Sequence, residues 1–262
     1  MAIPDTNTFN LQNVVNEVAP ISSDLSASFL AAIPAYFDSN YSGSKNSLLN
    51  FRNYKPTFVP TYGYMYNWYA ASNANFAPSG WHVPTEAEIT TLSNYVSGGV
   101  GVSIAGGKLK ITGTTFWATE NATDDYLFSA VGCGRRVSVF DSFRSVGYYW
   151  TSSNFFSNIA YSYQCNHSST VLQAGTSYAA VKYLGAGVRL LKNDSTNPGT
   201  LTDYDGNTYP TVKIGNQVWT RQNWKCTRLN NGTLIPTVTN DASWIALTTL
   251  GKCAFDNNES YV

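Results

Sequence analysis

Two stretches near the start of the chain place apolar residues at helical spacing. In LQNVVNEV (11–18) and SSDLSASFLAAI (22–33), apolar side chains recur every three or four positions, and Pro34 then interrupts the pattern. Residues 1–55 carry too little apolar surface to fold alone. We therefore expect this segment to dock on copies of itself or on a larger assembly, or else to cap the main domain as a helical piece.

The stretch PTEAEITTLSNYVSGG (84–99) signals one well-defined helix. Thr85 and Glu88 have the spacing of a capping box, and the paired glycines Gly98 and Gly99 are typical of a helix end. Apolar residues at positions 89, 92 and 96 supply its inward face. Because the cap already uses Glu88, and no second ligand lies near His82, we expect a structural role for the histidine.

Short strands dominate the rest of the chain. YGYMYNWYAA (62–71) alternates large aromatic residues and predicts a buried strand. Later strands are expected in FSAVGCGRR (128–136), SVGYYWTSS (145–153), IAYSYQCN (159–166) and AGVRLLKN (186–193). Few helices, many short strands and long polar loops favour an α+β domain.

Composition excludes several kinds of partner. Charged residues make up only 12% of the 262 residues, and 16 basic side chains balance 16 acidic ones, so neither nucleic acid nor an anionic membrane is an expected partner. No run approaches 18 apolar residues, so we expect no membrane insertion, and the start MAIPDTNTFN has no features of a signal peptide. Aromatic residues reach 15%, enough to leave some for a contact surface.

No catalytic motif is present in the sequence. It has no GxSxG, no glycine-rich phosphate loop and no HExxH. The four cysteines form no CxxC pair and have only two histidines to join them, so we predict no metal and no cofactor; free thiols are favoured, although disulfides are possible. DYDGN (203–207) has part of the pattern of a calcium loop, but an Asp-Gly turn before a strand is the favoured interpretation.

Several motifs, in order, resemble the Fibrobacter succinogenes major paralogous domain family. They are YGYMYNWYAA, SGWHVPTEAEITTL, GGKLKITGTTFW, FSAVGCGRR, GYYWTSS and GAGVRLLKN. The resemblance covers most of residues 62–192 and departs at VGCGRR. It implies a C-type lectin-like fold, near formylglycine-generating-enzyme-like domains and retroelement-diversified variable proteins. The resemblance does not include the paired redox cysteines of the formylglycine-generating domains, because Cys133 and Cys165 are expected far apart in different loops.

Residues 203–236 also resemble this family, but they resemble the segment that comes first in the usual order of the domain. We therefore expect a circular permutation, in which 56–192 forms the main part of the lectin-like domain and 193–262 completes it, joined by KNDSTNPGT (192–200). The strand within 208–219 should pair near GAGVRLLKN, and Trp219 and Trp224 should be buried against YNWYAA. A truncated second domain is the alternative.

The stretch 154–183 is the candidate binding surface. It mixes Asn, Ser, Tyr and Phe, which suit a versatile contact surface and are among the residues that randomised adenines in Asn codons yield. An ordinary polar loop of the family is the alternative. The receptor-binding candidates are Asn154, Phe155, Phe156, Asn158, Tyr161, Tyr163, His167 and Tyr178.

Residues 1–55 resemble, more loosely, the anchoring segments of phage structural proteins. Together these resemblances imply a non-enzymatic virion protein that binds a host cell-surface glycan or protein and contacts other virion proteins through its N-terminal segment. A homotrimer is expected by analogy with phage fibres. The alternatives are a decoration protein of capsid or tail, and a cell-surface enzyme domain of the formylglycine-generating kind.

Overall fold

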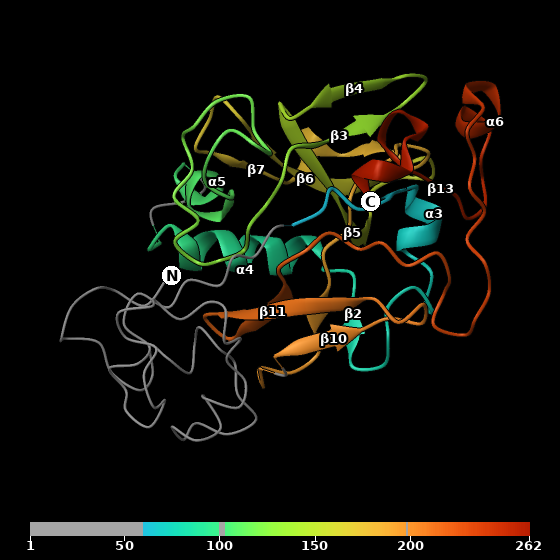
Figure 1. The fold of residues 1–262 in the computed structure, drawn as a ribbon. Helices are drawn as coiled ribbons and strands as arrows, with labels where there is room; N and C mark the ends of the chain where they lie inside the picture. The colour runs from blue at the N-terminus through green and yellow to red at the C-terminus, as the bar shows by residue number, and fades with distance from the viewer. Residues whose placement is uncertain (1–59, 100–102, 198) are drawn as a thin grey trace, which may run out of the picture.

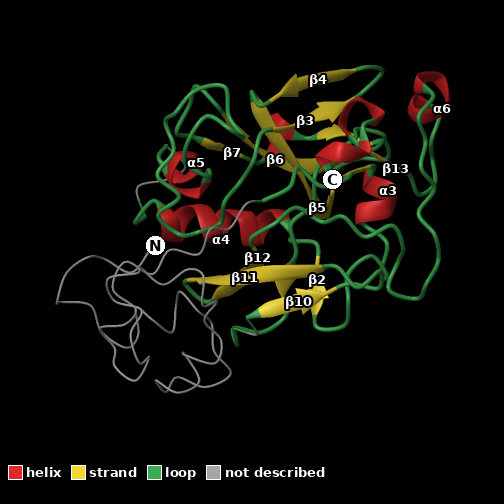
Figure 2. Cartoon of the chain, viewed as in Figure 1, coloured by secondary structure: helices red, strands yellow, loops and turns green. Residues whose placement is uncertain are grey.

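The computed structural model describes residues 60–99, 103–197 and 199–262. The expected N-terminal helices and their role in assembly lie outside the described residues. The described part consists mostly of short β-strands joined by long loops, with a few short helices (Figures 1 and 2). This arrangement is compatible with the predicted α+β class.

The elements are short, as the frequent turn residues predict. The strands are β1 (Met65–Tyr66), β2 (Trp81–His82), β3 (Cys133–Arg136), β4 (Phe140–Phe143), β5 (Val146–Asn154), β6 (Ile159–Asn166), β7 (Leu172–Gln173), β8 (Ala180–Val181), β9 (Leu191–Lys192), β10 (Thr200–Thr202), β11 (Thr208–Ile214), β12 (Gln217–Thr220) and β13 (Lys252–Cys253). The helices are α3 (Trp68–Ala71), α4 (Glu86–Val96), α5 (Ala105–Leu109) and α6 (Asp241–Ile245), with the 3₁₀ turns η3 (Thr176–Tyr178), η4 (Phe255–Asn257) and η5 (Glu259–Tyr261).

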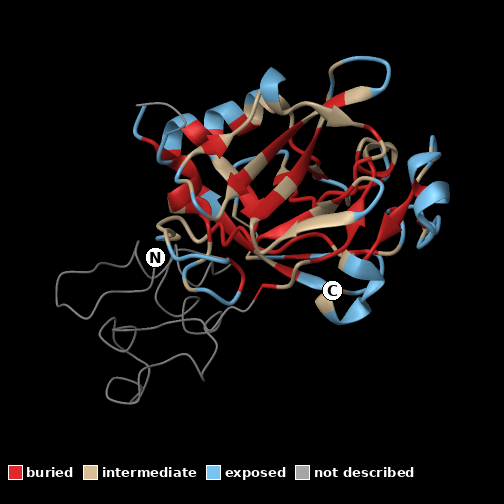
Figure 3. Cartoon of the chain, turned by 90° about the horizontal axis from the view of Figure 1, so that it is seen from above, coloured by how far each residue is buried: buried red, intermediate tan, exposed pale blue. Residues whose placement is uncertain are grey.

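Within the described residues the strands form three sheets. One has the order β4-β3-β5-β6-β7 with β8 also on β6, one has the order β10-β11-β12-β9-β2, and β1 pairs with β13. In Figure 1 the strands β3 to β7 lie above α4 and the strands β10 and β11 lie below it. Buried residues follow the central strands in Figure 3, whereas the short helices at the edge are largely exposed.

Helix α4 begins and ends as the sequence predicts. The Thr85 side chain accepts a hydrogen bond from the Glu88 backbone N–H, and the Glu88 carboxylate accepts one from the Thr85 backbone N–H, so the capping box is confirmed. The last helical residue is Val96, and both following glycines have positive φ. The apolar residues at positions 89, 92 and 96 are fully buried.

The prediction of one strand over 62–71 is only partly right. Pairing in β1 covers Met65 and Tyr66, and helix α3 follows immediately. The Asn67 side chain accepts a hydrogen bond from the Ala70 N–H at 3.0 Å and so caps that helix. An N-cap followed by two alanines favours a helical turn over continued pairing, although the aromatic alternation of the segment indicated a strand.

Residues 200–262 pack against residues 62–192 as parts of the same sheets and core. Trp219 in β12 pairs with Leu191 in β9, which confirms the pairing expected between 208–219 and 185–193. Trp224 is buried near Tyr66, Ala70 and Ala71 in one core cluster, as expected. Trp219 is equally buried but lies in the other cluster, away from the 67–71 segment, so the prediction for this side chain is wrong.

The end of the described chain lies beside its beginning. The Tyr62 N–H donates to the Tyr261 carbonyl at 3.2 Å, and the two rings meet edge to face. β1 pairs with β13 a few residues further on. The 193–200 connection therefore joins two parts of one folded body.

Candidate functional site

The β5–β6 hairpin forms the candidate binding surface. Its two strands pair antiparallel from Val146↔Asn166 to Trp150↔Ser162, and the register shifts before Asn154↔Ala160. Two backbone N–H groups, those of Phe155 and Phe156, then converge on the Ile159 carbonyl at 3.1 and 2.9 Å. This double contact closes the turn tightly and makes residues 154–159 the tip of the hairpin.

Aromatic side chains cluster at this tip. The rings of Phe155 and Phe156 lie 4.3 Å apart, and Phe155 meets Tyr161 edge to face at 4.9 Å. The Phe156 side chain is 60% exposed, and Asn154 and Asn158 beside it are exposed as well. An apolar ring held in water between amide side chains is a typical anchor for a contact surface.

Lys182 and Trp68 hold the tip in position. Lys182 is buried, and its ammonium donates to the Ser157 carbonyl at 3.0 Å while lying 4.3 Å from the centre of the Trp68 ring. Its backbone N–H donates to the Asn158 carbonyl at 2.9 Å. The Trp68 indole N–H in turn donates to the Thr151 carbonyl on β5 at 3.0 Å. The tip is therefore tied to helix α3, which lies far away in the sequence.

A groove of about 330 Å³ begins beside the tip, where β8 pairs with Ile159 and Ala160. It is lined by Arg135, Val137, Tyr148, Ser162, Gln164, Ser177, Tyr178, Ala179, Ala180, Val181 and Leu184. The Ser162 hydroxyl donates to the Tyr178 carbonyl and fixes η3 against β6. Arg135 lies over the Tyr148 ring and bonds Asp141 at 2.9 Å. The groove is thus lined by both polar and apolar side chains.

Two of the eight candidate residues lie elsewhere. Tyr163 is buried with 1% exposure and stacks on Tyr149 in the core, so the prediction that it contacts a receptor is wrong. The reason is the sheet: the face of β6 that carries Tyr163 also carries Cys165 and packs inward. His167 follows the opposite end of β6 from the tip and bonds Thr119. Asn154, Phe155, Phe156 and Asn158 lie in the tip, the Tyr161 ring contacts Phe155 beside it, and Tyr178 lines the groove.

Lys182 and Trp68 contact the hairpin, although the sequence pattern pointed to neither. Lys182 lies near the end of the polar stretch 154–183, so a solvent-exposed side chain was the simplest expectation. Trp68 lies in 62–71, which was predicted to be a strand. Only the fold shows that both lie against the hairpin. The one available signal was the position of Lys182 between apolar residues of 180–184, which favours partial burial.

His82 and Glu88 form a structural pair. His82 Nε2 lies 3.0 Å from a Glu88 carboxylate oxygen, and Nδ1 lies 2.6 Å from the Asn193 side-chain oxygen. The hydrogen bond to Glu88 raises the pKa of His82 against the opposing effect of burial. Burial by itself would raise the pKa of Glu88, but hydrogen bonds from His82 and Thr85 outweigh it and lower the pKa to about 2. Glu88 therefore has its side-chain partners at the helix entry, and His82 links that entry to Asn193 after β9.

The four cysteines are free and buried. Cys133 lies on β3 and Cys165 on β6, on the two sides of β5, so the expectation that they lie in different loops is wrong. Burial raises the pKa of Cys133 to about 11 and that of Cys165 to about 12. A thiol in this state is a poor nucleophile near neutral pH.

Asp203 and Asp205 shape the loop between β10 and β11. Asp203 accepts hydrogen bonds from the Asn207 backbone and amide and from the Tyr209 hydroxyl, and Gly206 has positive φ. Asp205 turns away toward Thr227 and Arg228. The favoured Asp-Gly turn is therefore present. Among the described residues, no three His, Cys, Asp or Glu side chains gather into a set that could hold a metal ion.

Comparison with known proteins gives one match. The sequence model of the family described as the Fibrobacter succinogenes major domain matches residues 36–192. The match begins inside the segment 1–55 that the sequence pattern set apart, and it ends at Lys192, before the 193–200 connection. No similar curated protein and no similar solved structure was found. In the described part of the chain, no helix is long and apolar enough to cross a membrane. The chain belongs to the Fibrobacter succinogenes major domain family.

Proposed function

We propose that this chain is a non-enzymatic phage virion protein that binds a host cell-surface protein or glycan through the tip of its β5–β6 hairpin and the adjacent groove. The observation that carries the proposal is the aromatic tip. Phe156 is exposed, and the turn that carries it is fixed by the buried Lys182. Burying such a ring in a partner releases water at a small cost in conformational entropy, because the loop is already ordered.

The groove extends this surface. Its lining includes Tyr178, Gln164 and Arg135 beside apolar residues such as Val181 and Leu184, so a partner side chain or a sugar ring could enter beside the tip. Tip and groove together would give an aromatic anchor and directional polar contacts on one continuous surface. Residues 154–183 also have the Asn-, Ser- and Tyr-rich composition expected of a diversified region.

A C-type lectin-like fold with circular permutation accounts for the chain order. In the family order inferred from the sequence, the segment ending at Val262 would run directly into Tyr62. The hydrogen bond between Tyr62 and Tyr261 and the β1–β13 pairing support that order. Completion of the sheet by β12 on β9 supports it independently.

The N-terminal segment would attach the domain to the particle. Residues 1–55 would contact other virion proteins and bring copies together, with a homotrimer as the proposed state. Several heads on one axis gain avidity for a surface that displays many receptors. The protein would then be found in the virion.

The raised thiol pKa values favour a binding role over oxidase chemistry of the formylglycine-generating kind. Cys165 is fully buried, as is Cys133, and neither presents a thiolate to a substrate.

The experiment compares Phe156→Ala and Asn158→Ala with Ile245→Ala, an exposed apolar side chain on helix α6. Purified full-length variants are tested for melting temperature and for binding to host cells. We expect each tip variant to change the stability by less than about 0.5 kcal/mol and to lose adsorption, with adsorption of the control unchanged. Full adsorption by both tip variants would contradict the proposed surface and leave a decoration role.

The diversification part is tested separately. A reverse transcriptase gene beside a near-copy of the region coding for residues 150–190 is the expected genomic arrangement. Capsid genes with neither feature would contradict diversification while leaving receptor binding to the adsorption test.

A further inference from the structure

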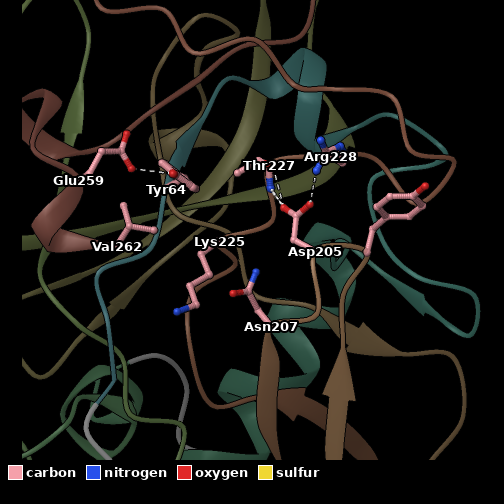
Figure 4. A pocket seen from close by; sticks show the side chains of 9 residues that line it. Tyr64, Asp205, Asn207, Lys225, Thr227, Arg228, Glu259 and Val262 are labelled. Carbon is pink, nitrogen blue, oxygen red and sulfur yellow. Dashed lines mark hydrogen bonds and ion pairs between the residues drawn. The ribbon is translucent and has the colours of Figure 1, made fainter.

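A second hollow, of about 630 Å³, lies on the part of the chain that completes the fold. It is lined by Tyr64, Tyr204, Asp205, Asn207, Lys225, Thr227, Arg228, Glu259 and Val262. Most of these residues come from the β10–β11 loop, the segment after β12 and the C-terminal turn. Figure 4 shows Glu259, Val262 and Tyr64 on the left, Asp205 and Arg228 on the right, and Lys225 and Asn207 below and between them. None of these residues belongs to the hairpin tip or its groove.

The polar groups of this hollow are held rigidly. The Asp205 carboxylate accepts hydrogen bonds from the Thr227 backbone and hydroxyl and from Arg228 at 2.9 Å. The side-chain N–H of Asn207 donates to Asp203 at 2.8 Å, and the side-chain oxygen of Asn207 takes no part in this bond. The Tyr64 hydroxyl donates to Glu259 at 2.6 Å. A ligand would meet donors and acceptors that are already in place, so little ordering is needed on binding.

Hydrogen-bonding capacity remains unused. Among the described residues, no hydrogen bond or ion pair engages the Lys225 ammonium, and Arg228 donates to Asp205 through only one of its nitrogens. Two cationic side chains, Lys225 and Arg228, face two carboxylates, Asp205 and Glu259. This balance favours neither a strong anion nor a cation, and it suits a neutral ligand with many hydroxyl groups.

Tyr204 supplies an exposed aromatic face at the edge of the hollow. Its side chain is 55% exposed although its ring lies against Gly232. A Cβ at Gly232 would come within 2.8 Å of the tyrosine hydroxyl oxygen, and this glycine has φ +85°, so a glycine is required for the ring to lie there. Gly232 thus borders the hydroxyl end of the ring, and the exposed part of the ring can receive a flat apolar surface.

We propose that this hollow binds a neutral oligosaccharide, with Tyr204 stacking on one sugar ring and Asn207, Lys225 and Arg228 bonding its hydroxyls. A sugar combines a flat apolar C–H face with a rim of hydroxyls, and the hollow offers one aromatic face beside a rim of fixed polar groups. Its volume falls within the roughly 300–1,000 Å³ typical of ligand sites. This site is independent of receptor binding at the hairpin tip.

The test titrates the full chain with maltotriose, cellotriose, mannotriose and chitotriose, and with trigalacturonate as the charged comparison, by NMR and calorimetry. We expect saturable binding of at least one neutral trisaccharide. Tyr204→Ala should weaken it at least about tenfold and Tyr204→Phe should retain it. The matched control is Tyr95→Ala, because Tyr95 is 54% exposed and its ring also lies against a glycine, Gly215.

Lys225→Met serves as a second variant, and its loss of affinity would support the site even if Tyr204→Ala failed to fold. Phe156→Ala at the hairpin tip should leave sugar binding unchanged, which separates this site from the proposed receptor surface. No saturable binding of any neutral trisaccharide would overturn the proposal. Unchanged affinity in folded Tyr204→Ala, or tighter binding of trigalacturonate, would overturn it as well.

Discussion

Replacing Arg189 by methionine should destabilise the protein severely, because this guanidinium joins the two parts of the fold. Arg189 is fully buried next to β9. It donates to the side chain of Asn223 at 2.6 Å and to the carbonyls of Phe128, Ser129 and Thr220 at 2.7, 2.8 and 3.0 Å. Burial lowers the pKa of Arg189, and these four hydrogen bonds go to an amide oxygen and three carbonyls, not to a carboxylate.

The magnitude follows from the acceptors left behind. Methionine keeps much of the apolar stem but donates nothing, so three carbonyls and one amide oxygen lose a partner in the interior. Each buried polar group without a partner costs about 1–3 kcal/mol, while removing the buried charge recovers several kcal/mol of desolvation. Four unpartnered acceptors, less the recovered desolvation, leave a net loss of about 3–5 kcal/mol.

Urea denaturation followed by tryptophan fluorescence measures this loss. The melting temperature should fall by about 6–20 °C, at roughly 2–4 °C per kcal/mol. Arg135→Met is the matched control, because Arg135 is 36% exposed and makes a surface ion pair with Asp141. That pair should contribute no more than about 1 kcal/mol. Equal stability losses in the two variants, or a loss below 1 kcal/mol for Arg189→Met, would refute the reasoning.

Three further predictions test other parts of the fold. A chain ending at Lys192 loses three buried tryptophans, Trp219, Trp224 and Trp244, and should show no cooperative melt by circular dichroism. A melt close to that of the full-length chain would contradict completion of the domain by residues 193–262. Tyr149→Phe should lose about 1–3 kcal/mol because its hydroxyl donates to the Val131 carbonyl and accepts from the Val131 N–H. Tyr163→Phe should be neutral or stabilising because that buried hydroxyl has no partner among the described residues, and similar losses in the two variants would contradict this contrast. Because the folded pKa of His82 is raised above 6.5, its ion pair with Glu88 should stabilise fully below pH 6.5 and lose that contribution as the pH rises through the folded pKa. The melting temperature of His82→Gln should therefore fall further below wild type at pH 5.5 than at pH 8.5, and an equal gap at both pH values would exclude this origin.

The sequence by itself determined the features that depend on local chemistry. Thr85, Glu88 and the paired glycines define helix α4 through hydrogen bonds and backbone angles within the segment, and the structure has each of them. The strand IAYSYQCN was predicted with its observed bounds because a run of β-favouring residues ends in polar turns. The resemblance to the family and the pairing of 208–219 with 185–193 could also be predicted from the sequence.

Only the tertiary structure decided which residues along one face of a strand are covered. Tyr161 and Tyr163 look equivalent in the sequence, yet one lies near the hairpin tip and the other is buried against Tyr149. Lys182 looks like a solvent-exposed lysine, but Trp68 and the 157–158 backbone surround it because helix α3 lies against β5. Local pattern fixes the period of a strand, whereas burial depends on what distant segments pack against it. The contacts of Lys182 and of Arg189 join residues at least 24 positions apart in the chain.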